Sequence, residues 1–305
     1  MTTSEMPKGQ HLLMPLLNLR FRQDDLQVTS DLSISRVTDA DRARWAADPE
    51  ASRLTVPEEL ETVTHAIYQR HSDVAPPLME ITEPAEDLFT LIGLLELRMP
   101  ERLRAPFIEW TSDGLGWPPA IYELPTAMRR WQQKFSTFVR IDDETLDAYW
   151  ANLTAPTDSA RRLRRALGRA TSARAEFFAE EVIMASTIGL ECLFSPDTEG
   201  SEPRNNTNIV VGSTVEWCLG PEPIEPAAAE DQFNEGKRQY RIRSMIVHGK
   251  ALSDSLNDDA KAVLQVLQSC VAIGLEVGST QLGTRRLFEQ FTSRVSPEFA
   301  AKISR

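Results

Sequence analysis

The sequence predicts an α+β protein, in which a strand-containing N-terminal domain over residues 1–140 precedes an all-α helical bundle over residues 141–305. Two patterns support this division. Short segments of the first part alternate apolar and polar residues, and a period of two is typical of strands with one buried face. From about Asp142, apolar residues recur at intervals of three and four, which is the spacing of one helix face. A chain of 305 residues is long enough for two domains that each bury a core.

The N-terminal domain is expected to contain two pairs of antiparallel strands. Leu26–Val28 and Leu32–Ile34 alternate apolar and polar residues on either side of a polar turn, which indicates the first pair. Phe107–Trp110 and Ile121–Leu124 flank a glycine-containing turn, which indicates the second pair.

Helices are also expected in this domain. The first is predicted from Asp39 to Ala47, because Thr38 or Asp39 can cap it and a proline follows its end. Leu88–Leu97 is apolar and is compatible with either a strand or a short helix. A further helix is expected at about Pro125–Val139. The domain has no recognisable site, so its role stays open, and one hypothesis is that it senses a ligand or partner.

The bundle is expected to hold four or five helices. They are predicted at Asp158–Phe194, Asn206–Leu219, Pro226–His248, Asn257–Val277 and, as the fifth, Gln281–Arg294. Glycines directly follow the second and third of these segments, as they commonly do at helix ends. The fourth would begin at an Asn257 cap, with Asp258 and Asp259 in the turn where the helix dipole favours acidic side chains. The first becomes apolar on more than one face from Val182 onward, so its second half should be deeply buried.

Charge is distributed unevenly along the chain. The formal net charge is −12, yet residues 1–150 carry 25 acidic and 15 basic side chains, whereas residues 151–305 carry 20 and 18. Basic residues of the second half cluster at Arg161, Arg162, Arg164, Arg165, Arg169 and Arg174, and again at Lys237, Arg238, Arg241, Arg243 and Lys250. Such stripes can bind phosphates in an acidic protein, or they can be solvated helix faces paired with nearby glutamates. For the second cluster we predict RNA phosphate contacts by Lys237, Arg238, Arg241 and Lys250.

Several classes of protein are disfavoured. No window approaches 18 consecutive apolar residues and the N-terminus lacks the order of a signal peptide, so we expect a cytoplasmic protein without a membrane partner. The chain has no phosphate-binding loop, dinucleotide fingerprint, HExxH, CxxC or GxSxG motif, so neither a cofactor nor a metal is expected. His65 and His71 lack a third ligand, and a surface or structural role is favoured. The three cysteines are interpreted as buried free thiols in preference to a disulfide or metal site.

The segment Tyr240–Lys250 carries the best candidate for chemistry. Arg243 and His248 are five positions apart, which is about 140° around a helix, so the two can flank a groove without stacking on one face. A histidine in the last helical turn lies at the negative end of the helix dipole, which favours the imidazolium form. It could accept a proton from a ribose 2′-hydroxyl or donate one to a leaving oxygen, while arginine holds the phosphate. The spacing alone is weak evidence, because the chain contains 27 arginines.

The surrounding sequence adds a resemblance to a known family. FNEGKRQYRIRSMIVHGK, residues 233–250, resembles the hallmark helix of HEPN domains, and specifically the Apea-like branch. EEVIMASTIGLECLF, residues 180–194, is similar to that branch's buried helix, and NNTNIVVGSTVEWCLG, residues 205–220, to its intervening helix. The three segments occur in the family's order over about residues 145–280. The resemblance implies a HEPN-type bundle that forms a homodimer with a composite ribonuclease cleft, to which Arg243 and His248 contribute the catalytic side chains.

The resemblance also suggests supporting residues. Glu191 corresponds to a polar position near the cleft, where it could orient Arg243 or His248, or be a buried structural carboxylate. Ser244 stands where the wider superfamily often has Asn or Asp after the arginine. Tyr240 lies one turn before Arg243 and could stack on a base, although a core position is the more common role.

The leading expectation is therefore a metal-independent endoribonuclease that acts on RNA, of the kind that serves in prokaryotic defence or as a toxin. A non-catalytic HEPN module for nucleic-acid binding or dimerisation, with the N-terminal domain as a sensor, is the alternative. An antitoxin-like partner of a nucleotidyltransferase is a third hypothesis, which the extra N-terminal domain disfavours.

Overall fold

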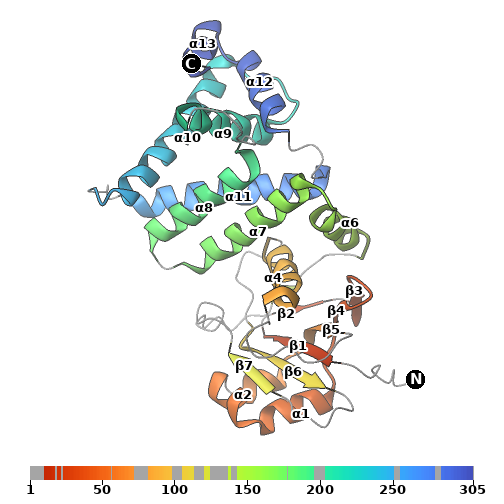
Figure 1. Ribbon diagram of the computed structural model, residues 1–305. Coiled ribbons are helices and arrows are strands. Elements are labelled where there is room, and N and C mark those ends of the chain that lie inside the picture. The colour runs from red at the N-terminus through yellow and green to blue at the C-terminus, as the bar shows by residue number, and fades with distance from the viewer. Residues whose placement is uncertain are drawn as a thin grey trace. The chain divides into compact units, whose positions relative to one another are not determined.

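The computed structural model describes most of the chain. The described residues are 10–17, 19–21, 23–55, 57–71, 82–97, 105–112, 120–123, 137–138, 143–176, 178–195, 203–250, 255–278 and 283–304. The chain divides into two compact units, residues 1–147 and 148–305, which are shown in Figure 1 and described separately below. The molecule is a mixed α+β protein in which an antiparallel sheet comes first and helices follow.

Unit 1 contains a six-stranded antiparallel sheet with the order β3-β4-β5-β1-β6-β7. Its strands are β1 Gln10–Leu16, β3 Asp25–Gln27, β4 Leu32–Arg36, β5 His65–His71, β6 Phe107–Ser112 and β7 Ala120–Glu123. Both expected strand pairs are confirmed, since Leu26 lies opposite Ile34 and Ile108 lies opposite Tyr122. A second, two-stranded parallel sheet joins β2, Leu19–Arg20, to β8, Thr137–Phe138.

Four described helices accompany the sheet of unit 1. They are α1 Asp39–Ala47, α2 Pro49–Leu54, α3 Pro57–Glu61 and α4 Thr82–Leu97. The expected cap of α1 is confirmed, because Thr38 accepts from the Asp41 amide and Asp41 accepts from the Thr38 amide. Leu88–Leu97, for which a strand and a short helix were both compatible, is part of helix α4. Most of the helix expected at 125–139 lies outside the described residues, and the expectation is wrong at Thr137–Phe138, which pair as strand β8.

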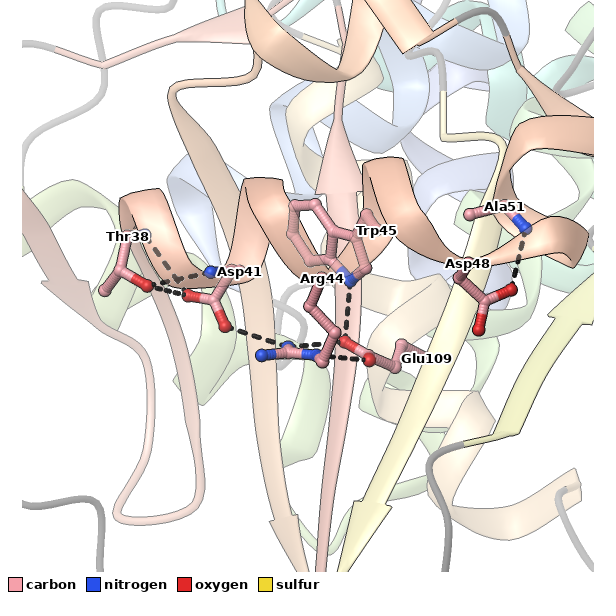
Figure 2. A network of polar contacts seen from close by, with 7 residues as sticks. All are labelled: Thr38, Asp41, Arg44, Trp45, Asp48, Ala51 and Glu109. Atoms are coloured by element: carbon pink, nitrogen blue, oxygen red, sulfur yellow. Dashed lines mark hydrogen bonds and ion pairs between the residues drawn. The ribbon is translucent and has the colours of Figure 1, made fainter.

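A buried carboxylate fastens α1 to the sheet, as Figure 2 shows. Glu109 of β6 is 1% exposed and accepts from Arg44 Nε at 2.7 Å, Arg44 Nη2 at 2.8 Å and Trp45 Nε1 at 2.6 Å. Arg44 also pairs with Asp41 at 2.8 Å. These acidic partners raise the pKa of Arg44 above its ordinary value, and the hydrogen bonds that Arg44 donates to Glu109 are the largest cause. Because the buried charge is both paired and hydrogen-bonded, it can be tolerated beside the apolar core that contains Trp45 and Phe107.

Unit 2 is entirely helical over its described residues. Helix α6, Asp143–Thr154, begins just before the division between the units, and α7 Asp158–Ala175, α8 Ala179–Phe194, α9 Pro203–Leu219, α10 Pro226–Val247, α11 Leu256–Val277, α12 Thr284–Arg294 and α13 Pro297–Ile303 follow. The single helix expected at Asp158–Phe194 is wrong, because Glu176 and Phe178 are extended and separate α7 from α8. The two helices are antiparallel neighbours, since Arg162 near the start of α7 donates to the carbonyl of Ser195, just past the end of α8.

Three helix starts differ from expectation, and the first is that of α9, which begins at Pro203 and not at about Asn206. Ser255 and not Asn257 is the N-cap position of α11, and its hydroxyl bonds to Asp259 in the first turn. The last expected helix begins at Thr284, and its expected start at Gln281 lies outside the described residues. Helix α13 was not expected, although Ser296 followed by Pro297 is a recognisable start signal.

Helix α11 is the central helix of unit 2 and packs against α7, α8 and α9. Its buried face includes Val263, Leu267, Cys270 and Val271. By length and composition α11 could also cross a membrane, with a mean hydropathy of 1.4 over an 18-residue window of which 39% is buried. A single helix of this kind is weak evidence for a membrane span, because the core helix of a soluble protein meets the same description. The C-terminal helices build a second cluster in which Phe233 of α10 stacks on Phe291 of α12 at 5.4 Å.

Candidate functional site

The candidate site lies at the C-terminal end of α10, where the chain makes a regular helix termination. Gly249 has φ +61°, the left-handed conformation that glycine adopts without steric cost. Its amide donates to the Ile246 carbonyl at 3.0 Å, and the Lys250 amide donates to the Met245 carbonyl at 2.9 Å. This double hydrogen bond is the Schellman arrangement. It fixes His248 as the C-cap residue of α10.

His248 lies on the solvent-exposed side of α10. Arg241, Ser244 and His248 are spaced by three and four residues, so they share one helix face, and all three are exposed. The rise of the helix puts Arg241 about 10 Å from His248 along the axis. An imidazole and a guanidinium are therefore available to a ligand on the same face, with a hydroxyl between them.

Arg243 lies on a different face and points toward α8. Its Nη2 atom is 3.3 Å from Glu191 Oε2, and the two side chains are 31% and 30% exposed. Burial raises the pKa of Glu191, and the charge of Arg243 only partly opposes this shift. The buried Nε of Arg243 has no hydrogen-bond partner among the described residues. Glu191 therefore contacts the arginine of the predicted pair, as one of its two expected roles requires.

Within the described residues of one chain, no hydrogen bond or ion pair joins Arg243 to His248. The structure brings Arg243 together with Glu191, and it brings His248 to the same face as Arg241 and Ser244. The predicted catalytic pair is thus divided between two sides of α10.

Tyr240 occupies a core position. Its ring packs against the cluster that contains Val211, Val215 and Phe233. Its hydroxyl is buried without a hydrogen-bond partner among the described residues, and burial raises the pKa of the phenol well above its usual range. Of the two roles expected for Tyr240, the geometry favours packing over base stacking.

The four residues predicted to bind phosphate fall into two groups. Lys237 donates to Asn208 Oδ1 at 2.8 Å, and burial lowers the pKa of its ammonium. Arg238 pairs with Glu235 at 2.6 Å and with Asp259 at 2.5 Å, so its charge is neutralised locally. Arg241 and Lys250 are exposed, and neither side chain has a hydrogen bond or ion pair within the described part of the chain. Only the second group presents free cations near His248.

A pocket of about 210 Å³ lies between α8, α9, α10 and α11. Most of its wall is apolar, with Leu190, Val211 and Val266 among its residues, and Tyr240 and Cys218 also contribute. The hydroxyl of Tyr240 has no accessible surface and therefore does not face this space. Neither Arg243 nor Glu191 lines the pocket, and its surface is mostly apolar.

Local structure accounts for His65. His65 is buried, with Nε2 3.0 Å from the Gln23 carbonyl and Nδ1 2.9 Å from Thr64 Oγ1, and burial lowers its pKa. His71 ends strand β5, opposite Gln10. No cluster of three or more potential ligands that could hold a metal occurs among the residues that the structure describes.

Two features of unit 2 were missed from the sequence. Arg162 donates to the carbonyls of Leu193 and Ser195, and it thereby satisfies the open end of α8. Its position in an arginine cluster gave no sign of this role. Cys218 and Cys270 are 52 residues apart, yet their sulfurs lie 3.4 Å from each other. The expectation of free thiols is confirmed, but Cys218 is exposed and Cys192 is only partly buried.

Fold and site together define an α+β protein of two units. In the helical unit, the long helix α10 ends at the exposed His248. Comparison of the chain with protein-family models, with curated proteins and with solved structures gave no match. The function is therefore argued from the site itself.

Proposed function

We propose that unit 2 is a metal-independent endoribonuclease that acts at the end of α10. The observation that carries this proposal is the exposed His248 at a rigid helix end, with Arg241 and Ser244 on the same face. Histidine can exchange a proton near neutral pH, and arginine can hold a phosphate by two hydrogen bonds. These are the two functions that cleavage of RNA without a metal requires.

The reaction is an internal transfer at phosphorus. The ribose 2′-hydroxyl loses its proton to a base and attacks the adjacent phosphorus, while the bond to the 5′-oxygen breaks and that oxygen takes a proton from an acid. The products are a 2′,3′-cyclic phosphate and a 5′-hydroxyl end. His248 supplies the base or the acid, and the His248 of a second copy supplies the other, so the active species is a homodimer.

A dimer also accounts for Arg243. Within one chain Arg243 and His248 are about 140° apart around the helix axis. A groove formed by two copies of α10 can present the arginine of one and the histidine of the other to the same phosphate. Glu191 then positions Arg243 through the 3.3 Å ion pair.

Chelator-resistant cleavage tests this proposal. Purified protein is incubated with single-stranded and structured RNA in excess EDTA, and the ends of the products are identified. We expect 2′,3′-cyclic phosphate ends, and a loss of activity of at least about 100-fold in His248→Ala, as for removal of a general acid or base. Arg243→Ala should also lose activity. Arg285→Ala is the matched control, because Arg285 is 94% exposed on α12 and lies outside the site.

A nucleic-acid-binding or dimerisation module without catalysis is the second candidate. It is favoured by the engagement of Arg243 with Glu191 and by the absence of a contact from Arg243 to His248 within one described chain. RNA binding without cleavage of any RNA, unchanged in His248→Ala, would establish this function and overturn the first.

A role as a defence or toxin-type effector follows if the ribonuclease proposal is right, with unit 1 as the sensor that controls it. Growth arrest and RNA loss on expression in a bacterial host, both absent for His248→Ala, are the expected result. Normal growth with intact RNA at a high level of soluble protein would contradict this role.

A further inference from the structure

Two cysteines of unit 2 meet at the contact between α9 and α11. Cys218 lies in the last turn of α9 and Cys270 lies in the buried face of α11. Their Sγ atoms are 3.4 Å apart, which is hydrogen-bonding distance for sulfur. The indole of Trp217 donates to the Cys270 carbonyl at 3.0 Å and holds the two helices together beside the thiols.

We propose that Cys218 and Cys270 are a redox-active thiol pair, which a hydroperoxide oxidises to a reversible disulfide between α9 and α11. A disulfide requires a sulfur separation of about 2.05 Å, so the sulfurs must approach by little more than 1 Å. The pair is independent of the ribonuclease proposal, because neither thiol contacts Arg243 or His248.

The two cysteines differ in a way that assigns their roles. Cys218 is exposed and lines the pocket between α8 and α11, so a small oxidant can reach it. Cys270 is fully buried. The hydrogen bond from Cys270 lowers the pKa of Cys218, whereas burial raises the pKa of Cys270. Cys218 is therefore the attacking thiolate and Cys270 the resolving thiol.

The chemistry balances with one hydroperoxide per disulfide. The Cys218 thiol releases its proton, the thiolate attacks one oxygen of hydrogen peroxide and the O–O bond breaks. The sulfur is thereby oxidised to a sulfenic acid, and the departing hydroxide takes up the released proton and leaves as water. Cys270 loses its proton and attacks the Cys218 sulfur, so that the S–S bond forms and a second water leaves. Hydrogen peroxide is reduced to two waters, and the protein loses two hydrogens. A dithiol reductant reverses the step by thiol–disulfide exchange.

Cys192 provides an internal control. It is partly buried on α8, and burial raises the pKa of its thiol. Neither of the other cysteines forms a sulfur contact with it among the described residues. Tryptic cleavage separates the three cysteines into residues 175–204, 205–237 and 262–285, so every pairing gives a distinct linked peptide.

Peptide mapping of the oxidised native protein tests the inference. The full chain is treated with hydrogen peroxide, free thiols are blocked, and the digest is analysed with and without reductant. We expect a linked peptide of residues 205–237 with 262–285, present also in Cys192→Ser and absent in Cys218→Ser and Cys270→Ala. Oxidation should also raise the Tm of the wild type by several degrees, because the disulfide closes a loop of about 50 residues, and reductant should remove the increase.

Other outcomes overturn the inference. They are a linked peptide that contains Cys192, a Cys218 that proceeds to sulfinic acid while Cys270 stays reduced, and no linked peptide at any ratio of peroxide to protein. Because Cys270→Ala changes a buried residue, Cys218→Ser gives the decisive comparison, since it changes an exposed one. A disulfide that persists in Cys218→Ser would exclude Cys218 from the pair.

Discussion

The guanidinium of Arg243 lies 3.3 Å from the carboxylate of Glu191, and this ion pair joins α10 to α8. The exposed His248 follows five positions later along the chain. One side of α10 is thereby fixed to the bundle, while the other presents Arg241, Ser244 and His248 to solvent. The pair is only partly exposed, and Glu191 is less easily ionised there than in water because burial raises its pKa.

The raised pKa of Glu191 makes a signed prediction about stability and pH. The folded state holds the Glu191 proton more tightly than the unfolded state does, so this group's contribution to stability falls as pH rises above its ordinary pKa of 4.5. Glu191→Gln removes that loss. We expect the difference in unfolding free energy, variant minus wild type, to increase from pH 4 to pH 8, as measured by urea unfolding at each pH. A difference in unfolding free energy that instead decreases as pH rises would mean that the ion pair with Arg243 outweighs the effect of burial on Glu191.

The buried carboxylate of unit 1 should be costly to remove. Glu109→Ala leaves the buried Trp45 indole N–H without its acceptor and leaves Arg44 with Asp41 as its acidic partner, and an unsatisfied buried donor of this kind costs about 1–3 kcal/mol. Urea unfolding followed by circular dichroism measures the loss. Glu50→Ala is the matched control, because its pair with Arg53 is exposed and should contribute less than about 0.5 kcal/mol. Equal effects of the two variants would show that the network in Figure 2 does not stabilise the unit.

Two glycines of unit 2 should respond oppositely to alanine. Neither has an atom within 4 Å of an added Cβ, so sterics with neighbours play no part. Gly249→Ala forces alanine into φ +61° and should destabilise unit 2 by about 1 kcal/mol. Gly168→Ala, inside α7, should stabilise it by about 0.5–1 kcal/mol through helix propensity. Thermal melts of both variants give the comparison, and a neutral Gly249→Ala would mean that α10 does not end in the left-handed conformation.

The basic residues near His248 should differ in their contribution to RNA binding. Arg241 and Lys250 are exposed, so Arg241→Ala and Lys250→Ala should each lower the slope of log affinity against log salt by roughly 0.7. Lys237→Ala should leave the slope unchanged, because Lys237 is bound to Asn208. Filter-binding titrations over a range of salt concentrations measure the slopes. If the RNA affinity of the wild type does not change with salt concentration, these arginines and lysines do not bind phosphate and are solvated side chains only.

Local signals in the sequence were sufficient for many elements and insufficient for others. Thr38 with Asp41 marks the start of α1, and Gly249 marks the end of α10, because both are short-range hydrogen-bond or backbone requirements. The break between α7 and α8 has no such mark. Glu176 is followed by two phenylalanines, which continue the apolar pattern without a proline or glycine. The break is visible only in the structure, where Glu176 and Phe178 are extended and α8 packs on α7.

The candidate site shows the same difference. Both Arg243 and His248 were predicted from the sequence, and helical spacing already puts them on different sides of a helix. Which side is covered depends on α8, whose Glu191 is 52 residues away along the chain. The pair of Arg238 with Glu235 is a local charge pattern, but the contacts of Lys237 with Asn208 and of Arg238 with Asp259 join different helices and could not be read from the sequence.

By itself, the sequence determined the two expected strand pairs, the start of α1, the end of α10 at Gly249 and the choice of the candidate catalytic residues, since each depends on neighbours close along the chain. The tertiary structure alone decided that Arg243 turns toward Glu191, that His248 stays in solvent, and that Cys218 meets Cys270. These are contacts between helices that are distant in sequence. They depend on how α10 packs on α8 and how α9 packs on α11, which the whole bundle specifies and no single segment does.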